Sequence, residues 1–523
     1  MKTTKILALC LLTLVLLGSL VSCGGEKPPV GPDGTTAPDV TGTPDNPVEE
    51  LPKLENLKIN GTPVSEYKII VRGTAYGAKY ASEYLQKQIF DLTGHKLQIS
   101  SGNAAAAFYV ESRDSEDGMY HIEVENTSIT LYGTGYAGAS VASKSLIEAI
   151  GRNEEVTLES ASEAMFKLNN VKKKLSDGKL MVGVIGASVS QGEGNTRPFC
   201  EFFLDSLKAV YPEADVQLKN RSIGGKNTHW GLYEIEGALL SEGYSDLFII
   251  SLGGNDGPYG AGYDEIALNY QSMIEKIYKS NPDAEIVMVP YGRKNEVRNI
   301  AQGNENPFMK AMLDVGLYYN VAVVDTTLEL YNTLSREGDF ETDWSKYIFD
   351  TVHPNNAGQA LYGNMLWKSV KAALDGSVGE ALSDTYIPSE PLFENSKVNA
   401  VKLSWDSIKG QIIFGTGDES GWTSKGRTTK TGSSISYEFE GIGLELGIGL
   451  NDVNPYMLLV QIYNEEGELV LEEERETGKL YHLYITNALE YGKYTLKLTV
   501  TRPSEKYPSE RPAFALTEIM IIK

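Results

Sequence analysis

Residues 175–375 alternate between short apolar segments and amphipathic helical segments, and this alternation constrains the fold more than any other feature of the chain. Residues 179–185 form a continuous apolar run, as expected for a parallel strand that is covered on both faces. Residues 199–210 carry apolar side chains at helical spacing. Further strands are predicted at 246–252, 284–289 and 321–324, and further helices at 264–280 and 356–374. The pattern predicts an open α/β sheet between two layers of helices.

The segments on either side of this region have different patterns of predicted strands and helices. Before it, strands at 67–71, 120–124 and 128–132 and helices at 77–92 and 137–150 indicate a small α+β domain. After about residue 385 the helical period disappears and short strands alternate with turn residues, as in a β-sandwich. The predicted sandwich strands are 434–439, 456–462, 494–500 and 518–522. We therefore expect three folded domains, at 54–165, 175–378 and 385–523.

The N-terminus has the pattern of an export signal. Lys2 and Lys5 precede an apolar stretch, which ends in Leu20-Val21-Ser22-Cys23. This ending resembles the bacterial lipobox, which implies a signal peptide over 1–23 and a lipid on Cys23. Residues 24–53 are rich in Gly, Pro, Thr and acidic residues, so a disordered tether is expected there. The expected location is outside the cytoplasm, anchored to the cell envelope. An ordinary secretory signal and an uncleaved membrane anchor are the alternatives.

Charge and cysteine content exclude several classes of protein. The formal net charge is −23 and no basic run occurs, so a nucleic-acid partner is disfavoured. Of the three cysteines, Cys10 and Cys23 belong to the signal segment, which leaves Cys200 without a disulfide partner. Cys200 lies among phenylalanines and is expected to pack in the core. With no Cys/His cluster, a structural zinc site is not expected. No other metal and no cofactor is expected either.

Four short segments of the central region follow predicted strands or precede its last helix. Ser188 comes directly after the strand that ends at residue 185, and Gly225 closes a second glycine-bearing turn. Asn255 follows two glycines at the end of the strand at 246–252. Asp350 and His353 stand just before Pro354, which suits the first turn of a helix. Open α/β sheets place their sites at these carboxyl ends.

In this order the four segments resemble the sequence blocks of the SGNH (GDSL-like) hydrolases, over about 180–375. The resemblance implies a three-layer, flavodoxin-like domain with Ser188 as the nucleophile and His353 as the general base, oriented by Asp350. Gly225 and Asn255, with the backbone N–H of Ser188, would then stabilise the oxyanion. Ala187 occupies a position at which the family usually has Asp, which bears on the subgroup more than on the activity.

The resemblance implies an ester hydrolase, and we expect short acyl groups, acetyl above all, to be removed from extracellular carbohydrate. The carbohydrate part rests on the surface anchor and on flanking domains that resemble those of glycan-processing enzymes. A lipid esterase, thioesterase or lysophospholipase of the same fold is one alternative. A non-catalytic, glycan-binding surface lipoprotein is another. The expected partners are an acylated carbohydrate or another small ester, and the membrane through the lipid.

Several further side chains have two interpretations. His229, the other histidine of the central region, is a rival to His353 as the general base, but it is expected instead at the rim of the site or in contact with substrate. Four residues near the motifs either line a sugar cleft or pack internally: Trp230, Tyr259, Arg293 and Trp344. Trp405 and Trp422, in the sandwich region, form either a carbohydrate platform or part of the core.

Overall fold

The computed structural model describes residues 52–241, 245–377, 388, 390–415, 421–449, 456–477, 482–503 and 514–523. Cys23, the signal segment 1–23 and the linker up to residue 51 therefore lie outside the described residues. Lys53–Lys523 forms one compact unit. Across the described ranges, no helix has both the length and the apolar composition needed to cross a membrane.

The central sheet consists of five parallel strands in the order β11-β10-β12-β13-β14. The strands are β10 (Lys179–Gly186), β11 (Asp215–Asn220), β12 (Leu247–Ser251), β13 (Glu285–Met288) and β14 (Ala322–Val323). The chain goes from β10 to one neighbour, β11, and then crosses over to the other, β12. The loops after β10 and β12 therefore diverge at a topological switch point, where sheets of this kind bind ligands.

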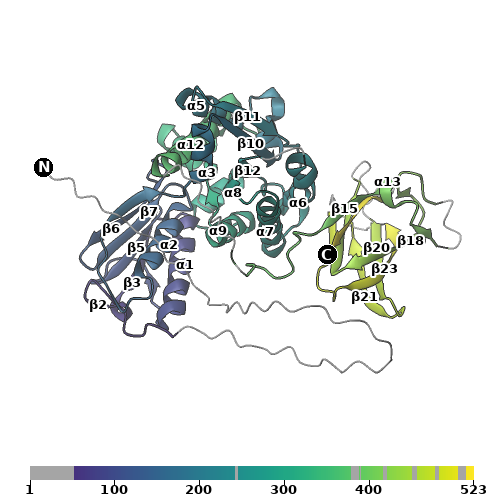
Figure 1. The fold of residues 1–523 in the computed structure, drawn as a ribbon, viewed down its shortest axis with the longest axis horizontal. Coiled ribbons are helices and arrows are strands. Elements are labelled where there is room, and N and C mark those ends of the chain that lie inside the picture. Colours follow the sequence, from purple (N-terminus) through teal and green to yellow (C-terminus); the bar gives the residue numbers. More distant parts are fainter. Residues whose placement is uncertain are drawn as a thin grey trace, which may run out of the picture. The chain divides into compact units, whose positions relative to one another are not determined.

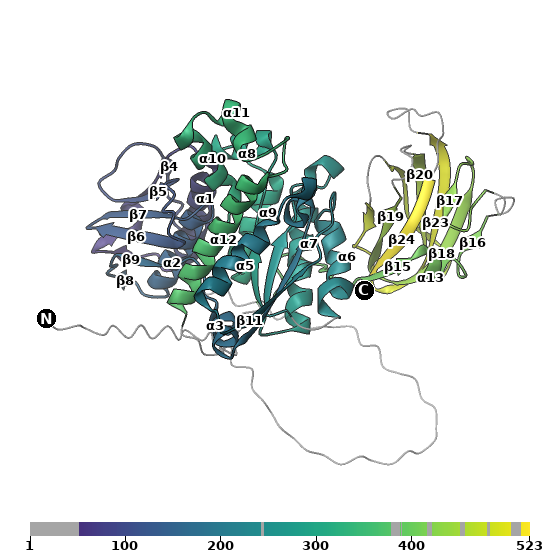
Figure 2. The same cartoon turned by 90° about the horizontal axis from the view of Figure 1, so that it is seen from above.

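Helices flank both faces of this sheet (Figure 1, Figure 2). On one side α5 (Phe199–Val210) packs against α12 (Asn356–Gly376). On the other, α7 (Tyr263–Ser280) packs against both α6 (Thr228–Ile235) and α9 (Pro307–Tyr319). Cys200 is buried on α5. The remaining helices of the region are α3 (Asn169–Ser176), α4 (Ser188–Gln191), α8 (Lys294–Ala301), α10 (Thr326–Glu337) and α11 (Phe340–Asp343).

The N-terminal region is built on a six-stranded mixed sheet in the order β4-β3-β5-β7-β6-β9. Helices α1 (Tyr76–Thr93) and α2 (Gly138–Ile150) pack against each other and against the sheet. The strands are β3 (Lys68–Arg72), β4 (Ile99–Ser100), β5 (Ala107–Glu111), β6 (Met119–Glu125), β7 (Ser128–Gly133) and β9 (Ala161–Ala164). A small second sheet joins β1 (Lys58–Ile59), β2 (Thr62–Pro63) and β8 (Glu155–Val156). The predicted α+β character is thus present.

Two antiparallel sheets make up the C-terminal region, as a β-sandwich requires. One has the order β15-β24-β19-β22, with β17 also paired to β24, and the other β16-β18-β23-β20-β21. Trp405 and Trp422 stack on each other 6.0 Å apart within its core, so they pack internally. The strands are β15 (Val401–Ser404), β16 (Ile413–Phe414), β17 (Arg427–Thr428), β18 (Ser434–Gly441), β19 (Gly443–Ile448), β20 (Tyr456–Asn464), β21 (Leu469–Glu476), β22 (His482–Thr486), β23 (Gly492–Pro503) and β24 (Phe514–Ile522).

The apolar core of the central region continues into both flanking regions. Tyr76 and Tyr136 from the N-terminal region and Met520 and Ile522 from β24 all belong to the same buried cluster. The division into three separate domains stays a prediction, because the contacts unite these regions in one compact unit.

Candidate active site

Ser188 lies at the junction between β10 and the short helix α4. The strand ends at Gly186, where a Cβ would approach the backbone oxygen of Ser251 on the neighbouring strand to 2.7 Å. Glycine therefore allows the two strands to run close together at the junction. Helix α4 begins at Ser188, so the backbone N–H of this residue has no carbonyl partner in the first helical turn. The side chain is only 7% exposed.

The imidazole of His353 lies between Ser188 and Asp350. His353 Nε2 is 2.9 Å from Ser188 Oγ, and His353 Nδ1 is 2.6 Å from Asp350 Oδ2. A carboxylate can only accept, so Nδ1 carries the proton and Nε2 is left to accept from the serine hydroxyl. The structure therefore brings together the three side chains predicted from the sequence, across 165 residues.

Asp350 is fixed by the backbone that follows it. Its Oδ1 accepts hydrogen bonds of 2.7 Å from the backbone N–H groups of Val352 and His353, which holds the loop in a tight turn. Partial burial alone would raise the pKa of Asp350, but the hydrogen bonds from His353 and Val352 outweigh it and hold this pKa below its usual value. The carboxylate consequently stays ionised at neutral pH and favours a proton on the facing imidazole nitrogen.

The two predicted oxyanion donors lie on neighbouring loops. Gly225 adopts a φ of 75°, a conformation that favours glycine. Beside it, the N–H of Gly224 donates to Gln191 Oε1 (2.7 Å), and a Cβ built on Gly224 would lie 3.7 Å from Ser188 Cβ. Asn255 is 8% exposed, and its Nδ2 donates to the backbone oxygen of Lys226 (2.9 Å). The loops that carry Gly225 and Asn255 are therefore tied together beside Ser188.

Asp256, the residue after Asn255, also connects the same two loops, a role that sequence reasoning missed. It is fully buried and accepts hydrogen bonds from the backbone N–H and the hydroxyl of Thr228. Burial raises the pKa of Asp256 to about 7, against the opposing effect of the Thr228 hydrogen bonds. The sequence signal that could have indicated this role is the position of Asp256, directly after Asn255 at the end of a buried strand.

The prediction for His229 is wrong. This residue is 1% exposed, its ring stacks on His482 at 4.0 Å, and its Nε2 lies 3.3 Å from Glu445 Oε2. Burial, and then the positive charge of Lys397, hold the pKa of His229 well below its usual value. Tyr233, on the same helix, α6, also donates to Glu445, so side chains of the C-terminal region cover His229 and remove it from any rim.

The other candidates divide between the core and the site. Trp230 and Trp344 are 8% and 5% exposed, and the Trp344 indole N–H donates to the backbone oxygen of Asp350. Arg293 donates to Asn255 Oδ1 (3.3 Å). The side chain of Tyr259 is outside the described part of the chain. Among the described residues, no group of three or more His, Cys, Asp or Glu side chains is placed to hold a metal ion.

Comparisons with solved structures bear on the fold. A two-domain esterase active on acetylated mannans, co-crystallised with mannopentaose, is 18% identical, covers 68% of this chain with 95% of its own length and gives a TM-score of 0.52. A second crystal structure of such an esterase gives 19% identity, the same coverage and a TM-score of 0.50. A catalytic mutant of an acetylxylan esterase from Geobacillus stearothermophilus is 19% identical and matches 36% of this chain with 94% of its own, at a TM-score of 0.31.

Comparison by sequence gives a family for the central region. No curated protein matches this chain. Residues 184–361 match the GDSL-like Lipase/Acylhydrolase family, and this range includes every residue of the site described above. Residues 184–361 therefore form a domain of the GDSL-like (SGNH) lipase/acylhydrolase family.

Proposed function

We propose that this protein is a serine ester hydrolase that removes short acyl groups, acetyl above all, from extracellular carbohydrate. One observation carries the hydrolytic part: the imidazole of His353 lies within hydrogen-bond distance of both Ser188 and Asp350. The Gly225 and Asn255 loops lie beside the same serine. A nucleophile, a base, an orienting acid and candidate oxyanion donors are the parts that acyl transfer to serine needs.

The proposed reaction follows from these positions. Ser188 Oγ attacks the ester carbonyl carbon while its proton passes to His353 Nε2. The tetrahedral oxyanion accepts hydrogen bonds from the N–H groups of Ser188 and Gly225 and from Asn255 Nδ2. The bond from the acyl carbon to the sugar oxygen then breaks while His353 gives its proton to that oxygen, so the sugar leaves as an alcohol and the acyl group stays on Ser188. Water attacks this acyl-enzyme by the same route and releases the carboxylic acid and free Ser188.

The substrate class rests on the neighbours in structure. The esterase that is similar over 68% of this chain is active on acetylated mannans, and its match extends well beyond the length of the hydrolase domain alone. Acetate release from acetylated mannan, xylan and pectin, with the Ser188→Ala variant as the control, tests the proposal. We expect release from at least one of these polymers and none from the variant.

The acyl group can be tested separately with a series of synthetic esters. Rates should fall steeply from acetyl through butyryl to octanoyl and palmitoyl esters if the site takes short acyl groups. A preference for octanoyl or longer chains would contradict this part of the proposal and favour the lipid esterase alternative.

We also propose that the mature chain begins at a lipidated Cys23 and is held at the cell envelope. The support is the apolar stretch that ends in Leu20-Val21-Ser22-Cys23. Intact-mass measurement on the membrane fraction should show a diacyl or triacyl adduct on Cys23. An unmodified mature N-terminus elsewhere would contradict the anchor.

A further inference from the structure

The side-chain amide of Asn255 has a definite orientation, because both of its ends have partners. Its Nδ2 donates to the backbone oxygen of Lys226 (2.9 Å), and its Oδ1 accepts from a terminal guanidinium nitrogen of Arg293 (3.3 Å). The reversed orientation would place the amide NH₂ against a cation that has only donors, and the amide oxygen against a carbonyl oxygen. One N–H of the amide is thus used by Lys226, and the second remains available to a ligand.

Arg293 is itself held by the start of helix α8. Its backbone N–H donates to Glu296 Oε2 (2.7 Å), and the next residue, Lys294, donates its N–H to the backbone oxygen of Thr351 (2.8 Å). Thr351 lies in the loop between Asp350 and His353. The segment that carries Arg293 therefore contacts both the Asn255 side chain and the loop of the catalytic acid and base.

The loop before Arg293 also lies directly beneath the Asn255 turn. A Cβ built on Gly254 would come within 2.6 Å of the Tyr291 ring, which is 2% exposed. This close packing leaves the backbone of the Asn255 turn little freedom. The side-chain torsions of Asn255 are fixed instead by its two hydrogen bonds, of which the one from Arg293 is charge-assisted.

The charge on Arg293 has a consequence for the amide. Arginine stays protonated in proteins, and Arg293 Nε is buried without a hydrogen-bond partner among the described residues. A cation on the amide oxygen draws electron density from the nitrogen, so it makes the free N–H a stronger donor. In a partly buried site such an effect is screened less than in water.

We propose that Arg293 is a positioning residue of the oxyanion hole: it fixes the amide of Asn255 so that one N–H points to the developing oxyanion, and it strengthens that donor. This inference rests on the proposed function, since it concerns the same ester hydrolysis. Arg293 acts through Asn255, so its effect should appear in turnover and should vanish when Asn255 is removed.

The test is a double-mutant cycle on para-nitrophenyl acetate with the full-length protein. Removing one oxyanion donor lowers kcat by about 10²–10³ in serine hydrolases, so Asn255→Ala should lose that much and Arg293→Ala about tenfold, with KM little changed in both. The double variant should be no slower than Asn255→Ala alone, because coupled residues are non-additive. Guanidinium at millimolar concentration should restore part of the rate of Arg293→Ala and none of that of Asn255→Ala.

Arg298→Ala is the matched control, because Arg298 lies on helix α8, which begins directly after Arg293, and pairs with Glu341 (2.8 Å). It should keep the wild-type kcat. Arg293→Lys, which keeps the charge, should fall between wild type and Arg293→Ala, and it carries the test if the alanine variant does not fold. The inference would be overturned if the losses of kcat in the two single variants were additive in the double variant, or if only KM changed. It would also be overturned if Arg293→Ala kept its kcat while Asn255→Ala lost it. Full activity in Ser188→Ala would instead overturn the proposed function.

Discussion

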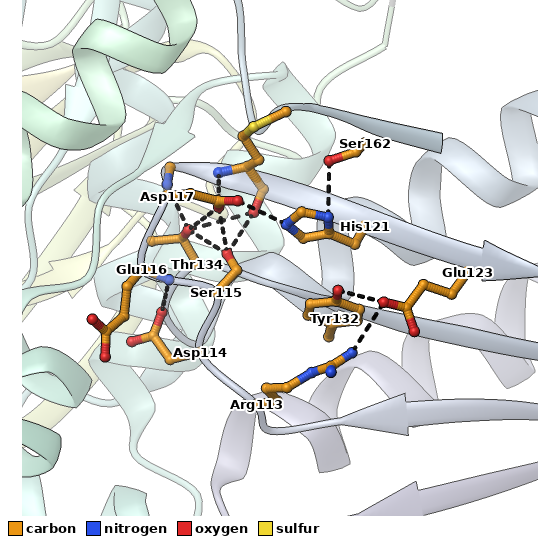
Figure 3. A network of polar contacts seen from close by, with 12 residues as sticks. Arg113, Asp114, Ser115, Glu116, Asp117, His121, Glu123, Tyr132, Thr134 and Ser162 are labelled. Atoms are coloured by element: carbon orange, nitrogen blue, oxygen red, sulfur yellow. Dashed lines mark hydrogen bonds and ion pairs between the residues drawn. The ribbon is translucent and has the colours of Figure 1, made fainter. Parts of the chain in front are cut away.

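Two hydrogen-bonded Ser–His–Asp series, each with the contacts of a triad, occur in the described part of this molecule. The distances between the side chains alone do not distinguish them. In the central region His353 joins Ser188 and Asp350 at 2.9 and 2.6 Å. In the N-terminal region His121 joins Ser162 at 2.8 Å and Asp117 at 3.0 Å. Figure 3 shows the second series, with Ser162 and Asp117 on opposite sides of the His121 ring.

The two series differ in what surrounds the serine. Ser188 begins a helix after a parallel strand, whereas Ser162 lies on the edge strand β9, directly opposite His121 on β6. The nitrogen that faces Ser162 is Nδ1, the reverse of the arrangement at Ser188. Ser162 is therefore part of a cross-strand pair on a sheet surface and does not stand at a turn toward which other loops converge.

Backbone donors show the same contrast. Near the second series, the N–H of Gly118 donates to Thr134 Oγ1 (2.8 Å), and that of Met119 to Asp117 Oδ1 (3.0 Å). Near the first, the N–H of Ser188 has no carbonyl partner in its helix, and the Asn255 amide keeps one free N–H. A contact among three side chains is therefore a weaker mark of a candidate site for acyl transfer than N–H donors that the fold leaves without a partner.

The largest expected effect separates the two serines. Ser188→Ala and His353→Ala should each lower kcat on acetyl esters by about 10⁴–10⁶, and the double variant should lose little more, because such residues act as a unit. Ser162→Ala and His121→Ala, measured in the same assay, are the matched controls and should keep their turnover. Loss of turnover in either control would break the comparison.

The two carboxylates give the next contrast. Asp350→Asn should lower kcat by about 10⁴, because an amide does not hold the imidazole in the required tautomer or stabilise its charged form. Asp117→Asn should leave the rate unchanged. The pKa values of both Asp350 and Asp117 lie below the usual value, so ionisation of the acid does not separate the series and only kinetics can do so.

The smallest expected effect is on stability. His121 and Ser162 contact each other on a solvent-accessible face of the sheet, and His121 also stacks on Tyr132 at 4.6 Å. Ser162→Ala should therefore reduce the free energy of unfolding by no more than about 1 kcal/mol, measured by urea denaturation. A much larger loss would show that this contact network supports the N-terminal sheet.

The sequence predicted the long, apolar elements of the central sheet and missed the polar one. β10 and β12 are buried along nearly their whole length, so their apolar runs were visible, whereas β11 is an edge strand in which only Val216 is buried. The motif segments predicted the side chains that meet at the strand ends, because parallel strands carry their loops to the same edge.

Contacts between distant elements that carry no recognisable motif could not be predicted. The hydrogen bond from Arg293 to Asn255 spans 38 residues and follows from where β12 and β13 end in the sheet, which no local pattern records. The burial of His229 depends on Glu445 and His482, more than 200 residues later. An isolated histidine beside a tryptophan looks the same in a sequence whether it lies at a rim or beneath another sheet.

Covalent labelling tests the central claim, that Ser188 is the nucleophile, most directly. The full-length protein would be incubated with a fluorophosphonate, and the modified serine located by peptide mass spectrometry. The account predicts one adduct, on Ser188, that forms as esterase activity is lost and is absent from His353→Ala over the same time. An adduct on Ser162, or complete inactivation with Ser188 unmodified, would contradict it.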